Sequence, residues 1–305
     1  MDTKQVTLEE LDTSNGVETE TPSRFAIYSE LTKARLTVLV LLTTLAGFLL
    51  ASNENVNYVH LLHTLFGTGL LAAGASALNQ WMERKWDALM KRTCQRPLPA
   101  KHIRPGEALA FGVVSSVIGT FYLLAAVNVL SAVIGLATLL SYILLYTPLK
   151  RYTAFNTLLG AIPGALPPVI GWVAAKGTWD TGAWILFGVL FFWQIPHFLS
   201  ISWIYREDYV NAGFRMLSND DNTGETTARH AIFYCIALVA VSLLPLFTGM
   251  TNLIYFSGAF ILGATFLAFC FRFMNERTYP RARALFLASV LYLPCLLALM
   301  TLDQA

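Results

Sequence analysis

Residues 108–149 read ALAFGVVSSVIGTFYLLAAVNVLSAVIGLATLLSYILLYTPL, a stretch of 42 residues without Asp, Glu, Lys or Arg. A helix that crosses a bilayer needs about 20 apolar residues. The stretch is therefore long enough for two such helices, and Asn128, near its middle, is the expected point of reversal. It predicts a multi-pass membrane protein built from helices.

The composition of the whole chain supports this prediction. Of 305 residues, 55% are hydrophobic and 13% are charged, and the mean hydropathy is +0.55. A soluble protein carries roughly 25% charged residues, so this chain has too little polar surface to cover a globule. The net charge is only +2, without the basic excess of a nucleic-acid-binding protein. We expect membrane lipid around the chain and no nucleic-acid partner.

Six further runs lack charged residues, at 36–53, 55–82, 152–175, 181–205, 230–271 and 284–302. Five of them fit one helix each, and the run 230–271 fits two, with a hinge at residues 249–252. The predicted fold class is therefore an all-α integral membrane protein with nine transmembrane helices. The expected segments are approximately 36–52, 59–81, 108–126, 129–147, 155–174, 183–204, 230–248, 253–272 and 284–302.

The basic residues fall on one side of these nine segments. Of the 21 Lys and Arg residues, 20 lie in the N-terminal segment and the alternate connections, and only Lys176 lies on the other side. Cytoplasmic loops carry the excess of Lys and Arg. We therefore expect the N-terminus and the long loops in the cytoplasm and the C-terminus outside.

The N-terminal segment is acidic and lacks apolar periodicity. We expect residues 1–29 to be a flexible cytoplasmic tail and residues 30–303 to be a single membrane domain. A mitochondrial transit peptide is rich in Arg and poor in acidic residues, which this segment is not. The expected location is therefore the inner membrane of a bacterial cell.

One group of polar side chains lies at the inner end of the second predicted helix. Asn79, Glu83 and Asp87 are four residues apart and share one stripe of a helix. The loop that follows, KRTCQRPLP at residues 91–99, adds Arg92 and Arg96. Mg²⁺ binds one or two carboxylates together with substrate phosphates, and Arg binds phosphate oxygens. The group therefore suggests a metal-bridged polyanion site, while helix-end solvation and a purely topological role for the cations remain alternatives.

A second group closes the sixth predicted helix, where Glu207 and Asp208 offer another pair of metal-binding carboxylates. His197 lies within the membrane beside Pro196, and an intramembrane ionisable group is a functional candidate. A neutral His that only packs is the alternative.

A third group joins the fourth and fifth helices at Tyr146, Lys150 and Arg151. The segment that follows, residues 156–168, holds three prolines and two glycines, a density that breaks or kinks a helix. We interpret it as the wall of a cavity, with close packing through small residues as the alternative.

Together these segments resemble the UbiA-type intramembrane prenyltransferases, and among them the branch that accepts haem. The resemblance covers roughly residues 30–295, and its motifs occur in family order. They are Asn79-x3-Glu83-Arg84-x2-Asp87, Arg92-Thr93-x2-Arg96-Pro97-Leu98-Pro99, Tyr146-Thr-Pro-Leu-Lys150-Arg151, Asn156-x3-Gly160-Ala-Ile-Pro-Gly-Ala-Leu-Pro-Pro168, Pro196-His197-Phe198 and Tyr205-Arg-Glu-Asp208-Tyr209-x2-Ala212-Gly213.

The resemblance implies nine helices around a central cavity and a reaction at its cytoplasmic mouth. In that reaction the farnesyl group of farnesyl diphosphate, together with water, is added to a vinyl group of haem b, which gives haem O and diphosphate. Haem b is then a substrate and Mg²⁺ the cofactor. Haem A synthase or an assembly factor of a terminal oxidase becomes an expected partner.

The resemblance also implies roles for individual residues. The expected metal ligands are Asn79, Glu83, Asp87, Glu207 and Asp208. The expected diphosphate-binding residues are Arg92, Arg96, Lys150 and Arg151. Tyr146 and Tyr205 would stabilise an allylic cation through their ring faces, and Asn156 and His197 would line the haem cavity.

The second acidic motif departs from that of related aromatic prenyltransferases, which carry Asp where this chain has Tyr205 and Tyr209. The departure favours the haem-accepting branch. Two other hypotheses remain, namely prenylation of a quinone-precursor ring and a transporter or haem-binding assembly protein. The first needs the same diphosphate site, whereas the second leaves the paired motifs unexplained.

Overall fold

The computed structural model describes residues 22–52 and 55–305, so residues 1–21 of the expected acidic tail lie outside the described residues. Within these two ranges, nine helices are long and apolar enough to cross a membrane. This number confirms the count expected from the charge-free runs.

The helices in chain order are α1 (Arg24–Leu31), α2 (Ala34–Ser52), α3 (Tyr58–Asp87), α4 (Pro105–Ala126), α5 (Val129–Leu140), α6 (Thr147–Leu149), α7 (Asn156–Lys176), α8 (Thr181–Ile204), α9 (Arg206–Asn211), α10 (Leu217–Asp220), α11 (Glu225–Phe247), α12 (Leu253–Asn275) and α13 (Tyr279–Leu302). A π-helical turn, Ser141–Tyr146, links α5 to α6. The expected end of the tail, at residue 29, falls inside α1, whose first turn is capped by the Ser23 hydroxyl.

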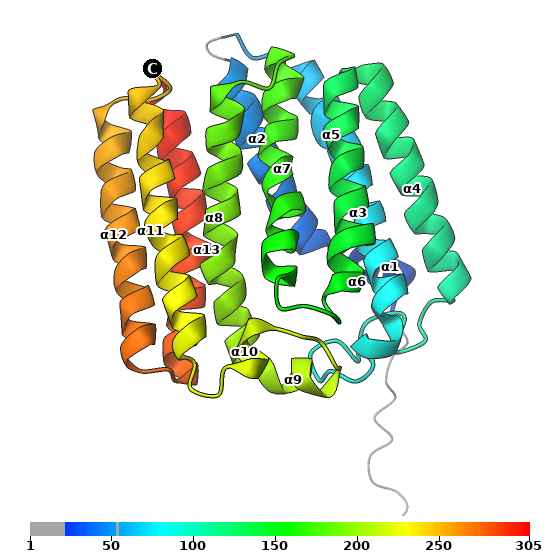
Figure 1. The fold of residues 1–305 in the computed structure, drawn as a ribbon. Helices are drawn as coiled ribbons and strands as arrows, with labels where there is room; N and C mark the ends of the chain where they lie inside the picture. Colours follow the sequence, from blue (N-terminus) through cyan, green and yellow to red (C-terminus); the bar gives the residue numbers. More distant parts are fainter. Residues whose placement is uncertain (1–21, 53–54) are drawn as a thin grey trace, which may run out of the picture.

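The long helices stand side by side, with α7 in the middle of the bundle (Figure 1). Helices α3, α4 and α5 lie on one side of it, and α8 with α11, α12 and α13 lies on the other. The short helices α9 and α10 lie across one end of the bundle, and the C-terminus lies at the opposite end (Figure 1). The loops that carry the expected site residues therefore meet at the end where α9 and α10 lie.

The two reversals expected inside the long apolar runs are confirmed. The side chain of Asn128 caps α5 by accepting a hydrogen bond from the N–H of Ser131 at 2.8 Å. Its amide also donates to the carbonyl of Val173 at 2.9 Å, which ties the reversal to α7. The second reversal follows α11, where Gly249 has a φ of 68°, a conformation that glycine adopts at little cost.

Helix α7 differs from the expected broken segment because it runs without interruption through Pro163, Pro167 and Pro168. Its interior is almost entirely buried, and small residues allow its neighbours to approach closely. A Cβ atom at Gly171 would overlap the carbonyl oxygen of Thr44 on α2, and one at Gly47 would overlap that of Pro168. Close packing, the alternative interpretation, therefore describes most of α7.

We predict that Gly171→Ala destabilises the protein, because its methyl group meets backbone, which cannot rotate away. The expected loss is about 1–3 kcal/mol, measured as a lower midpoint of thermal unfolding in detergent. Gly69→Ala is the matched control, since its Cβ would meet only Leu41 side-chain atoms at 3.6 Å or more. Equal midpoints for the two variants would contradict the prediction.

Candidate active site

The stripe of oxygen-bearing side chains on α3 is buried at the end of the bundle. Asn79, Glu83 and Asp87 are only 1%, 4% and 0% exposed. Helix α3 continues past residue 81 to Asp87, because residues 82–87 contain neither glycine nor proline. All three side chains therefore belong to one rigid helix, as the sequence spacing predicts.

Each of the two carboxylates is paired with a cation from a different connection. Lys150, which follows α6, donates a hydrogen bond to Glu83 at 2.8 Å. Arg96, in the loop after α3, donates to both oxygens of Asp87 at 2.8 and 2.9 Å. Buried carboxylates are stable only with such partners, so the two loops are held against α3 by charge.

Asn79 has a cationic neighbour that the sequence analysis did not identify. Lys33, between α1 and α2, donates to the Asn79 side-chain oxygen at 2.9 Å, and the Asn79 amide donates to the Thr147 hydroxyl at 3.2 Å. Lys33 has a φ of 49°, which is uncommon for a residue other than glycine. The only signal in the sequence was a Lys just before the first apolar run, where cations also serve topology.

The surroundings shift the pKa of both lysines. Burial, and next the charge of Arg96, lower the pKa of Lys33 to about 7. Burial also acts to lower the pKa of Lys150, but the Glu83 carboxylate and the Tyr146 ring outweigh it and raise that pKa above its ordinary value. Lys150 therefore remains an ammonium at neutral pH, whereas Lys33 loses its proton readily.

Two aromatic rings lie beside the ion pairs, on the side that faces the membrane-spanning part of the bundle. The π-helical turn places Tyr142 and Tyr146 together, with ring centroids 5.4 Å apart, and single π-turns within helices are frequent at functional sites. The Lys150 ammonium lies 4.4 Å from the centre of the Tyr146 ring. Gly160 is needed opposite, because a Cβ there would lie 2.5 Å from that ring. Tyr142 was not among the expected site residues.

Arg92 links the loop after α3 to the second acidic motif. Its backbone N–H donates to Asp208 at 3.3 Å, and its guanidinium donates to the Tyr209 hydroxyl at 3.2 Å. The guanidinium also lies 5.0 Å from the centre of the Tyr205 ring. The structure therefore brings Arg92, Asp208, Tyr205 and Tyr209 together.

Two other expected residues are placed at the surface of this region. Arg151 is exposed, with its guanidinium 4.4 Å from the centre of the Trp86 ring, and Glu207 is exposed on α9. Within residues 22–52 and 55–305, no three His, Cys, Asp or Glu side chains gather to form a metal site by themselves. The second acidic motif contacts the loop after α3 through Arg92.

The two residues expected in a haem cavity have different surroundings. Asn156 is fully buried and donates to the carbonyl of Arg215, which fastens the loop after α9 to the start of α7. His197 is part of α8, and its side chain contacts α13, where its Nδ1 is 2.7 Å from the Ser289 hydroxyl. Its ring stacks on Trp193 with centroids 5.0 Å apart and lies against Phe286.

Known proteins resemble this chain in sequence and in fold. The chain is 50% identical over 286 residues to protoheme IX farnesyltransferase of Solibacter usitatus, an alignment that covers 91% of this chain and 98% of that one. The fold is similar to that of digeranylgeranylglyceryl phosphate synthase, with a TM-score of 0.78, 18% identity, and coverage of 92% and 98%. It is also similar to a UbiA homolog from Archaeoglobus fulgidus bound to DMAPP and Mg²⁺, with a TM-score of 0.64, 16% identity, and coverage of 90% and 99%.

The sequence pattern of one protein family matches most of the membrane-spanning part of the chain. Residues 40–293 match the UbiA prenyltransferase family, in agreement with the resemblance found in the motifs. The chain therefore belongs to the UbiA prenyltransferase family.

Proposed function

We propose that the chain transfers the farnesyl group of farnesyl diphosphate to a vinyl group of haem b, which gives the hydroxyethylfarnesyl group of haem O. The observation that carries this proposal is the set of two buried ion pairs, Lys150–Glu83 and Arg96–Asp87, at one end of an apolar bundle. The name and 50% identity of the Solibacter relative support farnesyl and haem as the substrates.

The proposed transfer joins three reactants, which are farnesyl diphosphate, haem b and water. The allylic C–O bond of farnesyl diphosphate breaks, and its electron pair leaves with the diphosphate. The terminal vinyl carbon bonds to the farnesyl carbon, and a water molecule adds its oxygen to the other vinyl carbon and loses a proton. The protein must therefore bind a polyanion at one point and protect an allylic cation beside it.

The ion pairs provide the first of these functions through an exchange of partners. A diphosphate carries more negative charge than a carboxylate and offers more oxygens. Lys150, Arg96 and Lys33 would therefore turn from α3 toward it. Glu83 and Asp87 would then be free to bind a cation. Stabilisation of the charge that grows on a leaving group is often the largest contribution to catalysis.

The donor set on α3 fits Mg²⁺. The side-chain oxygens of Asn79, Glu83 and Asp87 are hard ligands on one face of a helix, and Mg²⁺ takes one or two carboxylates together with phosphate oxygens and water. Bound there, the ion would neutralise the leaving diphosphate. Asp208, positioned by the Arg92 N–H, and Glu207 would assist from α9. The Archaeoglobus homolog bound to DMAPP and Mg²⁺ supports this assignment.

The aromatic residues provide the second function. Tyr146 and Tyr142 lie between the cations and the apolar interior, where their ring faces would stabilise an allylic cation and the interior excludes water. Tyr205 would act with Arg92, which covers its ring. We assign Arg92 and Arg151 to the outer oxygens of the diphosphate as it enters or leaves.

Haem b would bind beside the farnesyl group. Asn156 would shape the haem-binding cavity by fixing the loop after α9. The Nδ1 atom of His197 is engaged by Ser289, and the other ring nitrogen would contact the haem iron or a propionate.

The distribution of charge supports an orientation in the inner membrane of a bacterial cell with this site facing the cytoplasm. The N-terminus would then be cytoplasmic and the C-terminus outside. Haem A synthase or an assembly factor of a terminal oxidase would receive the product.

We predict that Asp87→Asn and Glu83→Gln each lower the rate of haem O formation by about 10²–10³-fold, because each removes a charge needed to hold the metal and the diphosphate. The measurement is chromatography of haems extracted from reactions of purified protein with farnesyl diphosphate, haem b and Mg²⁺. Removal of Mg²⁺ by a chelator should abolish the activity, and its return should restore it.

Glu225→Gln is the matched control, since Glu225 pairs with Arg229 at the start of α11 and touches none of these groups. It should leave the rate unchanged. Full activity of Asp87→Asn would overturn the diphosphate site, and transfer of farnesyl to another acceptor with haem b untouched would overturn the choice of acceptor.

We predict further that the Lys150–Glu83 pair can be replaced for stability but not for catalysis. Lys150→Met leaves the Glu83 carboxylate buried without a partner and should cost about 3 kcal/mol. The double variant Glu83→Gln and Lys150→Met removes both charges and should recover most of the unfolding midpoint while it remains inactive. A double variant that stays as unstable as Lys150→Met would show that the pair is needed for folding itself.

A further inference from the structure

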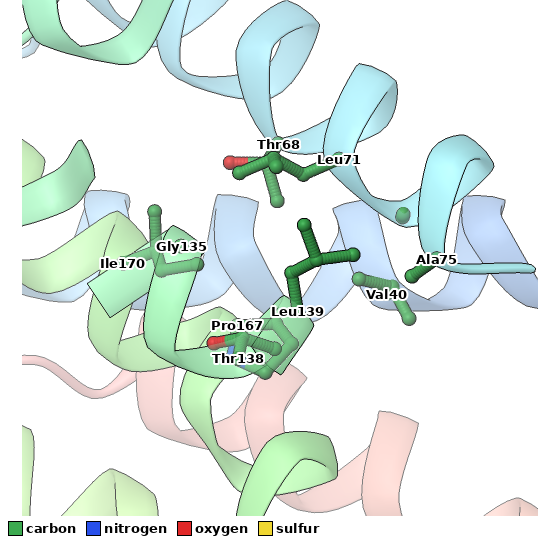
Figure 2. A pocket seen from close by; sticks show the side chains of 10 residues that line it. Val40, Thr68, Leu71, Ala75, Gly135, Thr138, Leu139, Pro167 and Ile170 are labelled. Atoms are coloured by element: carbon green, nitrogen blue, oxygen red, sulfur yellow. The ribbon is translucent and has the colours of Figure 1, made fainter. Parts of the chain in front are cut away.

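An apolar pocket lies between α2, α3, α5 and α7 (Figure 2). Its volume is about 40 Å³, a few times the ~10–15 Å³ that one water molecule needs. The walls include Leu71 and Ala75 on α3, Leu139 on α5 and Ile170 on α7. Such a pocket is suited to a small apolar group such as the branched end of a hydrocarbon chain.

The pocket lies on the same face of α3 as the carboxylate stripe. Thr68, Ala72 and Ala75 line it, and positions 68, 72, 75 and 79 follow one another at spacings of three or four along the helix. The pocket therefore lies inward of Asn79 on the same face of α3. Thr68 is eleven positions from Asn79, which corresponds to about 16 Å along the axis of α3. This length is of the same order as that of an extended chain of three isoprene units.

The wall of the pocket on the α5 side is closely packed and cannot move back easily. Leu71, Leu123 and Leu139 are 5%, 0% and 8% exposed. A Cβ at Gly135 would lie 2.6 Å from Leu71 and 3.1 Å from Leu123. In Figure 2 the side chain of Leu139 projects between Thr68 and Val40. A pocket of about 40 Å³ between such walls leaves room only for a small apolar group.

We propose that this pocket receives the last isoprene unit of the prenyl diphosphate, and that Leu71 and Leu139 limit the chain to three units. The proposal rests on the proposed function, which places the diphosphate beside Asn79. It adds the residues that select farnesyl over shorter and longer chains, and these lie far from the charged groups.

The test measures binding and needs no haem. The probes are the thiolodiphosphates of geranyl, farnesyl and geranylgeranyl chains, which release their prenyl group slowly, titrated with Mg²⁺ into the full chain in detergent. Leu139→Ala deepens the pocket and should favour the geranylgeranyl probe over the farnesyl probe by about tenfold relative to the parent. Ala72→Leu fills the pocket and should favour the geranyl probe by a similar factor.

Matched controls lie one residue away and do not line the pocket. Leu140→Ala and Ala73→Leu make the same changes at neighbouring, partly or largely exposed positions, and should keep the parent's order of affinities. The two pocket variants alter the preference in opposite directions, so the loss of one variant through misfolding leaves the other to decide.

The outcomes separate this proposal from the proposed function. If neither pocket variant changes the order of affinities while the parent still forms haem O, chain-length selection by this pocket is overturned and the farnesyl transfer stands. If the parent binds the farnesyl probe but modifies an acceptor other than haem, the choice of acceptor fails, and the order of affinities still decides on the pocket. A parent that binds none of the probes would overturn both.

Discussion

The burial of Glu83 and Asp87 at the end of a membrane helix is the constraint on which the rest of this structure depends. A carboxylate that is removed from water without a partner is strongly destabilising. The chain meets this requirement with Lys150 and Arg96, which come from two separate connections. The loop that directly follows α3 and a connection much later in the sequence are therefore brought to one face of α3, because the helix needs their charges.

The same requirement explains the order of the layers at this end of the bundle. Arg92, in the loop after α3, binds Asp208 and Tyr209, and the Tyr146 ring lies beside the Lys150 ammonium. A buried ion pair contributes little net stability by itself. Under the proposed function, the two pairs would instead hold cations at this end of the bundle that a bound diphosphate could draw away from α3.

Much of this could be predicted from the sequence, and the failures have physical causes. Charge-free runs count helices well because lipid permits few other structures, and the spacing of Asn79, Glu83 and Asp87 fixes a shared helix face. Lys33 and Tyr142 escaped notice because tertiary contacts alone give them a role. The unbroken course of α7 was also missed, since its neighbours pack closely enough to hold a helix that local sequence disfavours. Glu207 was expected to act beside Asp208, but its side chain is exposed. Neighbouring residues in a sequence need not point in the same direction.

The separation of charge along α3 also has a chemical consequence. All the cations that meet the stripe lie at the level of Asn79 or outside it, whereas the face of α3 beyond Asn79 continues into small and apolar residues such as Ala75 and Ala72. A prenyl diphosphate aligned with this face would have its leaving group among cations and its hydrocarbon among methyl groups. When the allylic bond breaks, the negative charge would stay with Lys150 and Arg96, and the positive charge would arise at the level of the Tyr146 ring. The change from charged to apolar residues along α3, which suits the helix to the membrane, would therefore also favour cleavage in which the diphosphate keeps the electron pair.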